Sequence, residues 1–273
     1  MKTIEKILVT QLRCFLLLNT LFLLLAAVSV PCLAQNKDSQ MAKRERVLIT
    51  TVTVKPDMTG DFENLIKNEY NPGIAKGGAK WSDVWRNAVF GNGFDYTFVT
   101  PIDGFAQLDG ISPLMKGLGK EGAAAWYAKA GKMVTNVRGV AYEVRDDLSY
   151  RTNMTAPPKM AVVTHTSVAP GRASEFENFI KNDLLPVVKQ SGIAGYWMNK
   201  TMFGGDVNEY SSLVLLENFA ELEKGPPQVR VLGQEGAMKL VQKLPVGVVV
   251  RQERIFARYV PELSYRPAMT TNK

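Results

Sequence analysis

The sequence predicts an α+β protein in which one β-α-β-β-α-β unit is present twice in tandem. An internal repeat and the character of each first strand carry this prediction. The segment FENLIKN at 62–68 recurs as FENFIKN at 176–182, and LSYR at 148–151 recurs at 263–266. The spacing of such matches stays between 113 and 115 residues along the chain. Self-similarity at a fixed spacing indicates a repeated structural unit.

Each half begins with a strand and a helix. The strands are expected at 47–55 and 160–168, because both segments are rich in Val, Ile and Thr. Neither face of these strands is strongly polar, which is typical of a strand buried on both sides. A helix follows, with Phe62 or Phe176 on its apolar face.

The remaining elements also occur in the same order in both halves. Pro72 and Pro186 are expected to bend or end the first helix. Two strands then form a hairpin across a glycine-containing turn: 85–90 with 94–100, and 196–203 with 210–216. A helical region broken by prolines and a fourth strand complete each half: 104–134 with 136–145, and 218–244 with 246–260. The firm part of this helix is expected after Gly122 and Gly236.

The first residues have the pattern of a secretory signal peptide. Lys2, Lys6 and Arg13 precede an apolar run at 15–30, and small residues lead up to Ala34. An uncleaved anchor is the alternative, but the run is shorter than the about 20 residues that a spanning helix needs. We therefore expect cleavage after Ala34, a secreted or periplasmic location, and no stable membrane insertion afterwards.

These observations set the expected boundaries. They are a signal peptide (1–34), a flexible leader (35–46), two repeats (47–151 and 160–266), a stiff linker (152–159) and a tail (267–273).

Composition limits the chemistry of the mature chain. Cys14 and Cys32 both lie in the signal peptide, so no disulfide, thiolate nucleophile or cysteine-bound metal is expected. The net charge of +7 falls to +5 when Lys2, Lys6, Arg13 and Glu5 are removed. The remaining charges are scattered among acids, which argues against a nucleic-acid partner.

The β-α-β-β-α-β order is that of a ferredoxin-like unit. Such a unit carries its helices on one face of the sheet and leaves the other face bare, so the bare face needs a partner. Two units whose sheets pack face to face enclose a barrel. With its element order, Pro72 and Pro186, and the matching segments 96–105 and 210–219, the chain resembles the dimeric α/β-barrel superfamily. That group contains antibiotic-biosynthesis-type monooxygenases and NIPSNAP-like proteins.

The resemblance covers nearly the whole predicted mature chain, but it is one of pattern and not of a catalytic signature. It implies a cavity, between the helices and a sheet or between the two sheets, that holds a small aromatic or apolar ligand. Some members are cofactor-free oxygenases, some bind haem, and many have no assigned activity. The fold alone does not choose among these functions.

His165 is the single histidine of the chain and the strongest candidate for chemistry. By strand alternation it shares a face with Ser167, and its counterpart in the first half is Thr51. An imidazole in a cavity can act as a general base or as an axial haem ligand. The alternative is a structural histidine bonded to a neighbouring hydroxyl or backbone group. Thr51 and Ser167 are candidate ligand-binding hydroxyls.

Aromatic residues are the other candidates. Trp85 and Trp197 lie in similar places in the two halves and are expected to line a ligand pocket or to fill a core. Glu63 and Glu177 are expected to be solvated or at the junction between the halves.

Other chemistries have little support. One histidine without cysteine argues against a zinc site, so no metal and no cofactor is predicted. The segment GLGKEG at 117–122 matches the dinucleotide-binding pattern in letters only, because it lies inside a helical region instead of following a strand.

Three functions therefore stay open. The first is an exported protein that binds a small apolar or aromatic molecule in a barrel cavity without catalysis. The second is a cofactor-independent monooxygenase-like enzyme that uses His165 with Thr51 and Ser167. The third is a haem-binding protein. The sequence leaves open whether the halves pair within one chain or in a homo-oligomer.

Overall fold

The computed structural model describes residues 44–152, 154 and 158–267. The predicted signal peptide, nearly all of the leader, part of the linker and most of the tail lie outside the described residues. None of the described helices is both long and apolar enough to cross a membrane.

The elements of the first half occur again in the same order in the second. The first half contains β1 (Arg46–Val54), α2 (Thr59–Leu65), α3 (Asn71–Lys76), β2 (Asp83–Asn87), β3 (Asp95–Ile102), α4 (Pro113–Met133) and β4 (Val134–Val144). The second contains β6 (Met160–Val168), α5 (Ala173–Phe179), α6 (Leu185–Val188), β7 (Gly195–Phe203), β8 (Glu209–Leu216), α7 (Pro227–Gln242) and β9 (Val249–Tyr259).

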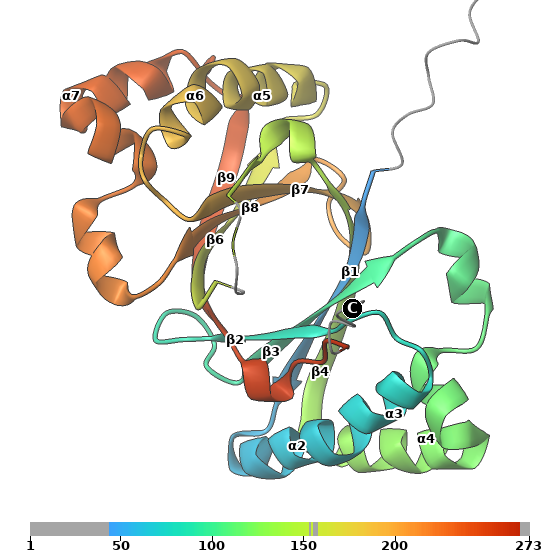
Figure 1. The fold of residues 1–273 in the computed structure, drawn as a ribbon. Helices are drawn as coiled ribbons and strands as arrows, with labels where there is room; N and C mark the ends of the chain where they lie inside the picture. The colour runs from blue at the N-terminus through green and yellow to red at the C-terminus, as the bar shows by residue number, and fades with distance from the viewer. Residues whose placement is uncertain (1–43, 153, 155–157, 268–273) are drawn as a thin grey trace, which may run out of the picture. The chain divides into compact units, whose positions relative to one another are not determined.

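Eight antiparallel strands close into one barrel, with α2, α3 and α4 on one side and α5, α6 and α7 on the other (Figure 1). Their order is β4-β1-β3-β2-β9-β6-β8-β7, and β7 pairs back with β4. The two predicted sheets therefore also join edge to edge, at a β2–β9 seam and a β4–β7 seam. A short strand that the sequence did not predict, β5 (Tyr150–Arg151), pairs with the start of β7.

Strand alternation separates two environments. On β1, Val52 and Val54 pack against the helices, whereas Ile49 and Thr51 face the barrel interior. The helix side of each half is a compact core, centred in the first half on Phe62 and in the second on its counterpart Phe176. The apolar character of both strand faces thus matches a strand covered by helices outside and by the barrel inside.

Pro72 and Pro186 do not end the helices. A wider π-helical turn lies immediately before each proline region, at Ile66–Tyr70 and Ile180–Leu184, and an α-helix continues beyond it. Proline has no N–H to donate to the preceding turn, and the wider turn accommodates the lost hydrogen bond.

The second helix of each half is broken by a glycine just before the part that was expected to be firm. The breaks lie at Gly119 and Gly233, whose φ angles are +75° and +67°. These are left-handed angles that glycine adopts without steric cost. The GLGKEG segment therefore lies within α4, as a break in a helix and not as a phosphate-binding turn.

Glu63 and Glu177 are not free, solvated side chains. Each accepts a hydrogen bond of 2.5 Å from a tyrosine hydroxyl, Tyr96 or Tyr210 respectively, whose ring packs in the helix-side core. Glu177 also meets Arg145, which follows β4 of the first half, so it does lie at the junction of the halves. The two glutamates fix the first helix of each half to its own sheet.

Candidate functional site

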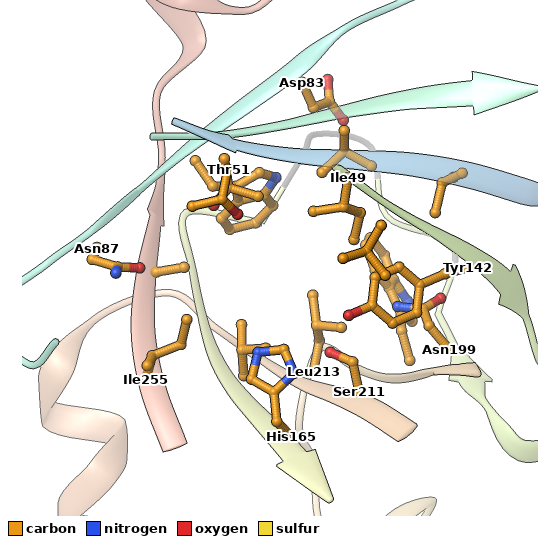
Figure 2. Close-up of a pocket in the computed structure, with 18 of the residues that line it drawn as sticks. Ile49, Thr51, Asp83, Asn87, Tyr142, His165, Asn199, Ser211, Leu213 and Ile255 are labelled. Atoms are coloured by element: carbon orange, nitrogen blue, oxygen red, sulfur yellow. The ribbon is translucent and has the colours of Figure 1, made fainter. Parts of the chain in front are cut away.

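The barrel encloses a cavity of about 1150 Å³. Inward-facing side chains from strands of both halves line it, with Ile49 and Thr51 across from His165 and Leu213 (Figure 2). The predicted site residues all line this one cavity: Thr51, Trp85, His165, Ser167 and Trp197. Their roles in binding or catalysis stay predictions.

The cavity has chemically different ends. β1, β2, β6 and β7 run in the same direction, because one antiparallel strand separates each from the next. Trp197 lies near the start of β7 and Trp81 lies just before β2, so both are near one end of the barrel. His165 lies near the end of β6, and Glu209 begins the opposed strand β8, so these two are near the other end. We call these the indole end and the polar end.

The indole end contains three of the four tryptophans of the chain: Trp81, Trp85 and Trp197. Trp85 and Trp197 belong to one apolar cluster with Val163 and Leu213. Arginine side chains lie over two of the rings, with Arg266 above Trp81 at 5.5 Å and Arg151 above Trp197 at 5.3 Å. These contacts hold the indole rings of Trp81 and Trp197 in place, and the rings form an apolar part of the cavity wall.

Trp85 and Trp197 are not structural counterparts, contrary to the prediction. Val99 and Leu213 are counterparts in the two halves. Leu213 pairs with Trp197, whereas Val99 pairs with Asp83, so the counterpart of Trp197 is Asp83. Trp85 pairs with Thr97 and so corresponds to Asn199, which pairs with Ser211. Each tryptophan is therefore specific to its own half, and the two walls of the cavity differ.

His165 lies in a polar row that crosses four neighbouring strands. Its register partner on β8 is Ser211, and the partner of Ser211 on β7 is Asn199. Ser211 is 3% exposed and Asn199 is 8% exposed, so both hydroxyl and amide are withdrawn from bulk water. On the other side of His165, Glu253 of β9 completes the row.

A carboxylate lies beside the imidazole. The Nδ1 atom of His165 is 3.4 Å from Oε1 of Glu209, and Nδ1 is buried without a hydrogen-bond partner among the described residues. A carboxylate at this place favours a proton on Nδ1 and leaves the other ring nitrogen to accept a proton or bind a ligand. The arrangement is therefore suited to a hydrogen-bonded polar group or to proton transfer.

Tyr142 adds a phenol to the lining. It is 4% exposed and borders the cavity from β4. Burial raises the pKa of Tyr142, and the negative charge of Glu209 raises it further. The hydroxyl therefore stays protonated at neutral pH.

Sequence reasoning missed Tyr142, Asn199, Glu209 and Ser211. The alternation of strands β4, β7 and β8 could have placed each on the His165 face, but only the pairing register shows that they meet. Among the described residues, no group of three or more His, Cys, Asp or Glu side chains could hold a metal ion.

No protein-family model matches the sequence, and no curated protein matches it. Solved structures do match. An anthrone oxidase-like protein is 14% identical with a TM-score of 0.57, over 80% of this chain and 92% of that one. A candidate monooxygenase from Fusobacterium nucleatum is 10% identical with a TM-score of 0.54, over 83% of this chain and all of that one.

A mutant chlorite dismutase from Candidatus Nitrospira defluvii is also similar. It is 8% identical with a TM-score of 0.50, over 79% of this chain and 92% of that one. At such low identity a structural match shows the fold and not the activity. Together with the closed eight-stranded sheet, these matches show that the chain has the ferredoxin-like α/β-barrel fold.

Proposed function

We propose that the chain is an exported protein that binds a small aromatic or apolar molecule in the barrel cavity. The observation that carries this proposal is a cavity of about 1150 Å³ with three tryptophans at one end and the His165–Glu209 pair at the other. A flat apolar body would pack among the indole rings, and one polar group would reach His165. Mostly apolar pockets with a few placed polar groups are typical small-molecule sites.

Binding is expected to quench the emission of the cavity tryptophans. A useful probe is 4-nitrobenzyl alcohol, a small aromatic molecule whose nitro group quenches indole emission on contact. Trp126 packs in the helix-side core of the first half, outside the cavity lining. Trp126→Phe should therefore retain the quenching, whereas Thr51→Phe, which places an aromatic ring inside the cavity, should weaken it. Equal quenching in the Thr51→Phe protein would contradict binding beside Thr51 in the barrel.

Export is part of the proposal and rests on residues 1–34. The exported protein is expected to begin at Gln35. Mass spectrometry of the secreted or periplasmic protein measures the mass of the chain and so identifies its first residue. A mass that still includes residues 1–34 would contradict cleavage and favour an anchor.

We infer in addition that the two halves arose by tandem duplication of a ferredoxin-like unit in a NIPSNAP-like lineage. The shared π-helical turns, the glycine breaks at 119 and 233, and the two tyrosine–glutamate bonds support this origin. The halves close the barrel within one chain, so closure needs no second copy. Self-association is a separate proposal, which a solution mass measurement tests.

A cofactor-independent oxygenase is the second candidate, because a carboxylate lies beside the single histidine. In this function His165 takes a proton from an acidic carbon of an aromatic substrate, and Glu209 orients the imidazole. Anthrone is a suitable test compound, since loss of that proton lets dioxygen oxidise it to anthraquinone and water. His165→Ala should abolish oxygen consumption, whereas Glu209→Gln should lower the rate with a smaller effect on KM. Unchanged oxygen consumption in the His165→Ala protein would remove this role.

Haem binding is the third candidate. The residues fit one axial ligand, because His165 has a carboxylate beside Nδ1, as metal-bound histidines commonly do. Arg138 and Arg251, which border the same end of the cavity, could hold the propionates. A bound haem would supply redox chemistry that the side chains do not. A Soret band that appears on haem addition and is lost in His165→Ala would support it, and its absence would exclude it.

A further inference from the structure

The first part of β9 is a free edge of the sheet. On one side β9 pairs with β6 from Val249 to Arg258. On the other side β2 pairs only with the last part of β9, from Ala257 to Tyr259. Residues 251–254 are therefore paired on one side only, and all four are exposed to solvent. An unpaired strand edge is a template on which another strand can form hydrogen bonds.

The corresponding edge of the first half is covered. Gly204, in the hairpin after β7, lies so close to β4 that a Cβ on it would be 2.2 Å from the carbonyl oxygen of Gly139. The residue of β9 that corresponds to Gly139 is Arg254, because Gly139 pairs with Thr50 and Arg254 pairs with Thr164 at the same place in the second half. The two edges therefore differ, and the one on β9 is the more open.

The hairpin after β2 turns away from β9 instead of covering it. The pairing of β2 ends at Asn87, and the Ala88 N–H then donates to the Phe256 carbonyl at 2.8 Å. Val89 has a φ of +66°, which is costly for a β-branched residue, and the Phe90 N–H donates back to the Ala88 carbonyl at 2.7 Å. This strained turn takes the hairpin off the line of β2 and leaves the edge of β9 open.

Backbone alternation decides which polar groups face the free edge. The N–H of Tyr259 donates to Lys159, just before β6, whereas the carbonyl of Phe256 accepts from the β2 side. Successive residues of a strand direct their N–H and C=O groups to opposite sides. The backbone groups of Gln252 and Arg254 therefore face the free edge. Within the described part of the chain, they have no backbone hydrogen-bond partner on that side.

This edge is complementary to itself in one register. Two identical strands that pair antiparallel about a twofold axis have one residue beside that axis. An axis at Arg251 or at Glu253 would place two like charges directly opposite each other, which is destabilising. An axis at Arg254 would need the carbonyl of Phe256, which is already bonded. Of residues 251–254, only Gln252 can lie on the axis without conflict, and its N–H and C=O then bond those of the partner's Gln252.

The charges match in that register. Arg251 lies opposite Glu253 of the partner subunit, and Glu253 lies opposite the partner's Arg251. The two side chains are 72% and 56% exposed, and within one chain they form an ion pair of 2.7 Å. Pairing of two copies therefore places two positive and two negative groups alternately across the interface, which favours this register over others.

Exposed apolar side chains flank the same edge. Val250 is 68% exposed and Phe90 is 56% exposed. Phe90 lies beside Gln252 and Arg254 on the helix side of β9. Because Arg254 would lie opposite the partner's Val250, that valine would come to rest next to the ring of Phe90. Each copy thus offers an apolar contact at both ends of the paired segment.

We propose that the free edge of β9 is an interface through which two copies of this chain associate, by antiparallel pairing of residues 250–254 about Gln252. The pairing also affects the barrel. Arg251 and Glu253 line the polar end of the barrel cavity, and Glu253 is the register partner of His165. The partner's Arg251 therefore adds a positive charge beside this end of each cavity. The interface itself does not depend on ligand binding in the barrel.

Sedimentation equilibrium of the purified protein tests the interface. The wild-type protein should have twice the mass of a single chain. Gln252→Pro removes the outward N–H without taking a hydrogen bond from β6, so it should halve the mass. Gln252→Ala retains the N–H and should remain dimeric, and circular dichroism checks that both variants are folded. A monomeric wild-type protein, or a folded Gln252→Pro protein that associates as tightly as the wild type, would overturn the proposal.

Charge reversal tests the register without any change in the backbone. Glu253→Arg and Arg251→Glu each place like charges opposite each other, so each should weaken association about tenfold or more. An equal mixture of these two variants should form mixed dimers, because every opposed pair is then complementary. Arg138→Glu, at the place on β4 that corresponds to Glu253, is the matched control and should leave the dimer intact. Single reversals that associate like the wild type, or a mixture that stays monomeric, would overturn the register.

Discussion

Gly117→Ala is expected to destabilise the protein by about 3 kcal/mol, as overpacking of a tight contact does. The new Cβ would lie 1.8 Å from the carbonyl oxygen of Gly73 and 3.0 Å from the amide nitrogen of Gly77. Both atoms belong to the backbone, so no side-chain rotation can relieve the clash, and α3 must move away from α4. Urea denaturation followed by circular dichroism measures the loss.

Gly131 on the same helix provides a matched control. A Cβ there meets nothing within 4 Å, so Gly131→Ala gains helix propensity without a clash. It should stabilise the protein by up to about 1 kcal/mol. Equal stability of the two variants would mean that α3 and α4 do not touch as closely as the structure shows.

Arg145→Met is expected to cost about 3 kcal/mol, the usual effect of removing one partner from a buried ion pair. The arginine side chain is 6% exposed and donates to both oxygens of Glu177 at 2.5 and 2.8 Å. It also donates to both oxygens of Asp147 at 2.9 and 2.8 Å. Its loss removes the cation that Glu177 and Asp147 share, and only Lys200, at 3.2 Å, still pairs with Glu177. Arg172→Met, which removes an exposed pair with Glu175, should cost much less.

The same cluster predicts how stability depends on pH. Burial raises the pKa of Glu177, but hydrogen bonds from Arg145 and Tyr210 and the charge of Arg145 outweigh it, so the pKa falls from 4.5 to about 2. A carboxyl whose pKa is lower in the folded state stabilises the protein above its unfolded pKa, and this stabilisation is lost as pH falls through the folded pKa. The wild-type protein should therefore lose on the order of 3 kcal/mol between pH 5 and pH 2 through this group.

Glu177→Gln tests that assignment, because the amide does not titrate. The variant should be less stable at pH 7, and its free energy of unfolding should change less between pH 5 and pH 2. Chemical denaturation at a series of pH values measures both. An identical pH slope in the two proteins would assign the acid sensitivity to other carboxyls.

The sequence was sufficient to predict the order of the elements, because repeated letters and strand composition are local signals. It also placed His165 on the same strand face as Ser167, since a period of two decides which face a residue occupies. It could not pair Trp85 with its true counterpart, Asn199. That correspondence depends on the pairing register between β2 and β3. Residue identity alone suggested that the tryptophan of one half corresponds to the tryptophan of the other.

Long-range contacts were the other limit. Glu177 was expected to be solvated or at the junction between the halves because it falls on a helix face away from Phe176. Its actual partners, Arg145 and Tyr210, come from elements far apart in sequence and could not be named from the sequence.

Closure of the barrel by two halves of one polypeptide has a consequence for symmetry. A barrel assembled from two identical chains would present every inward side chain twice, related by a twofold axis. Here the imidazole of His165 faces a wall that carries Thr51 at the equivalent place. A single covalent chain can thus hold an asymmetric, oriented molecule in one direction only, which a symmetric dimer could not impose.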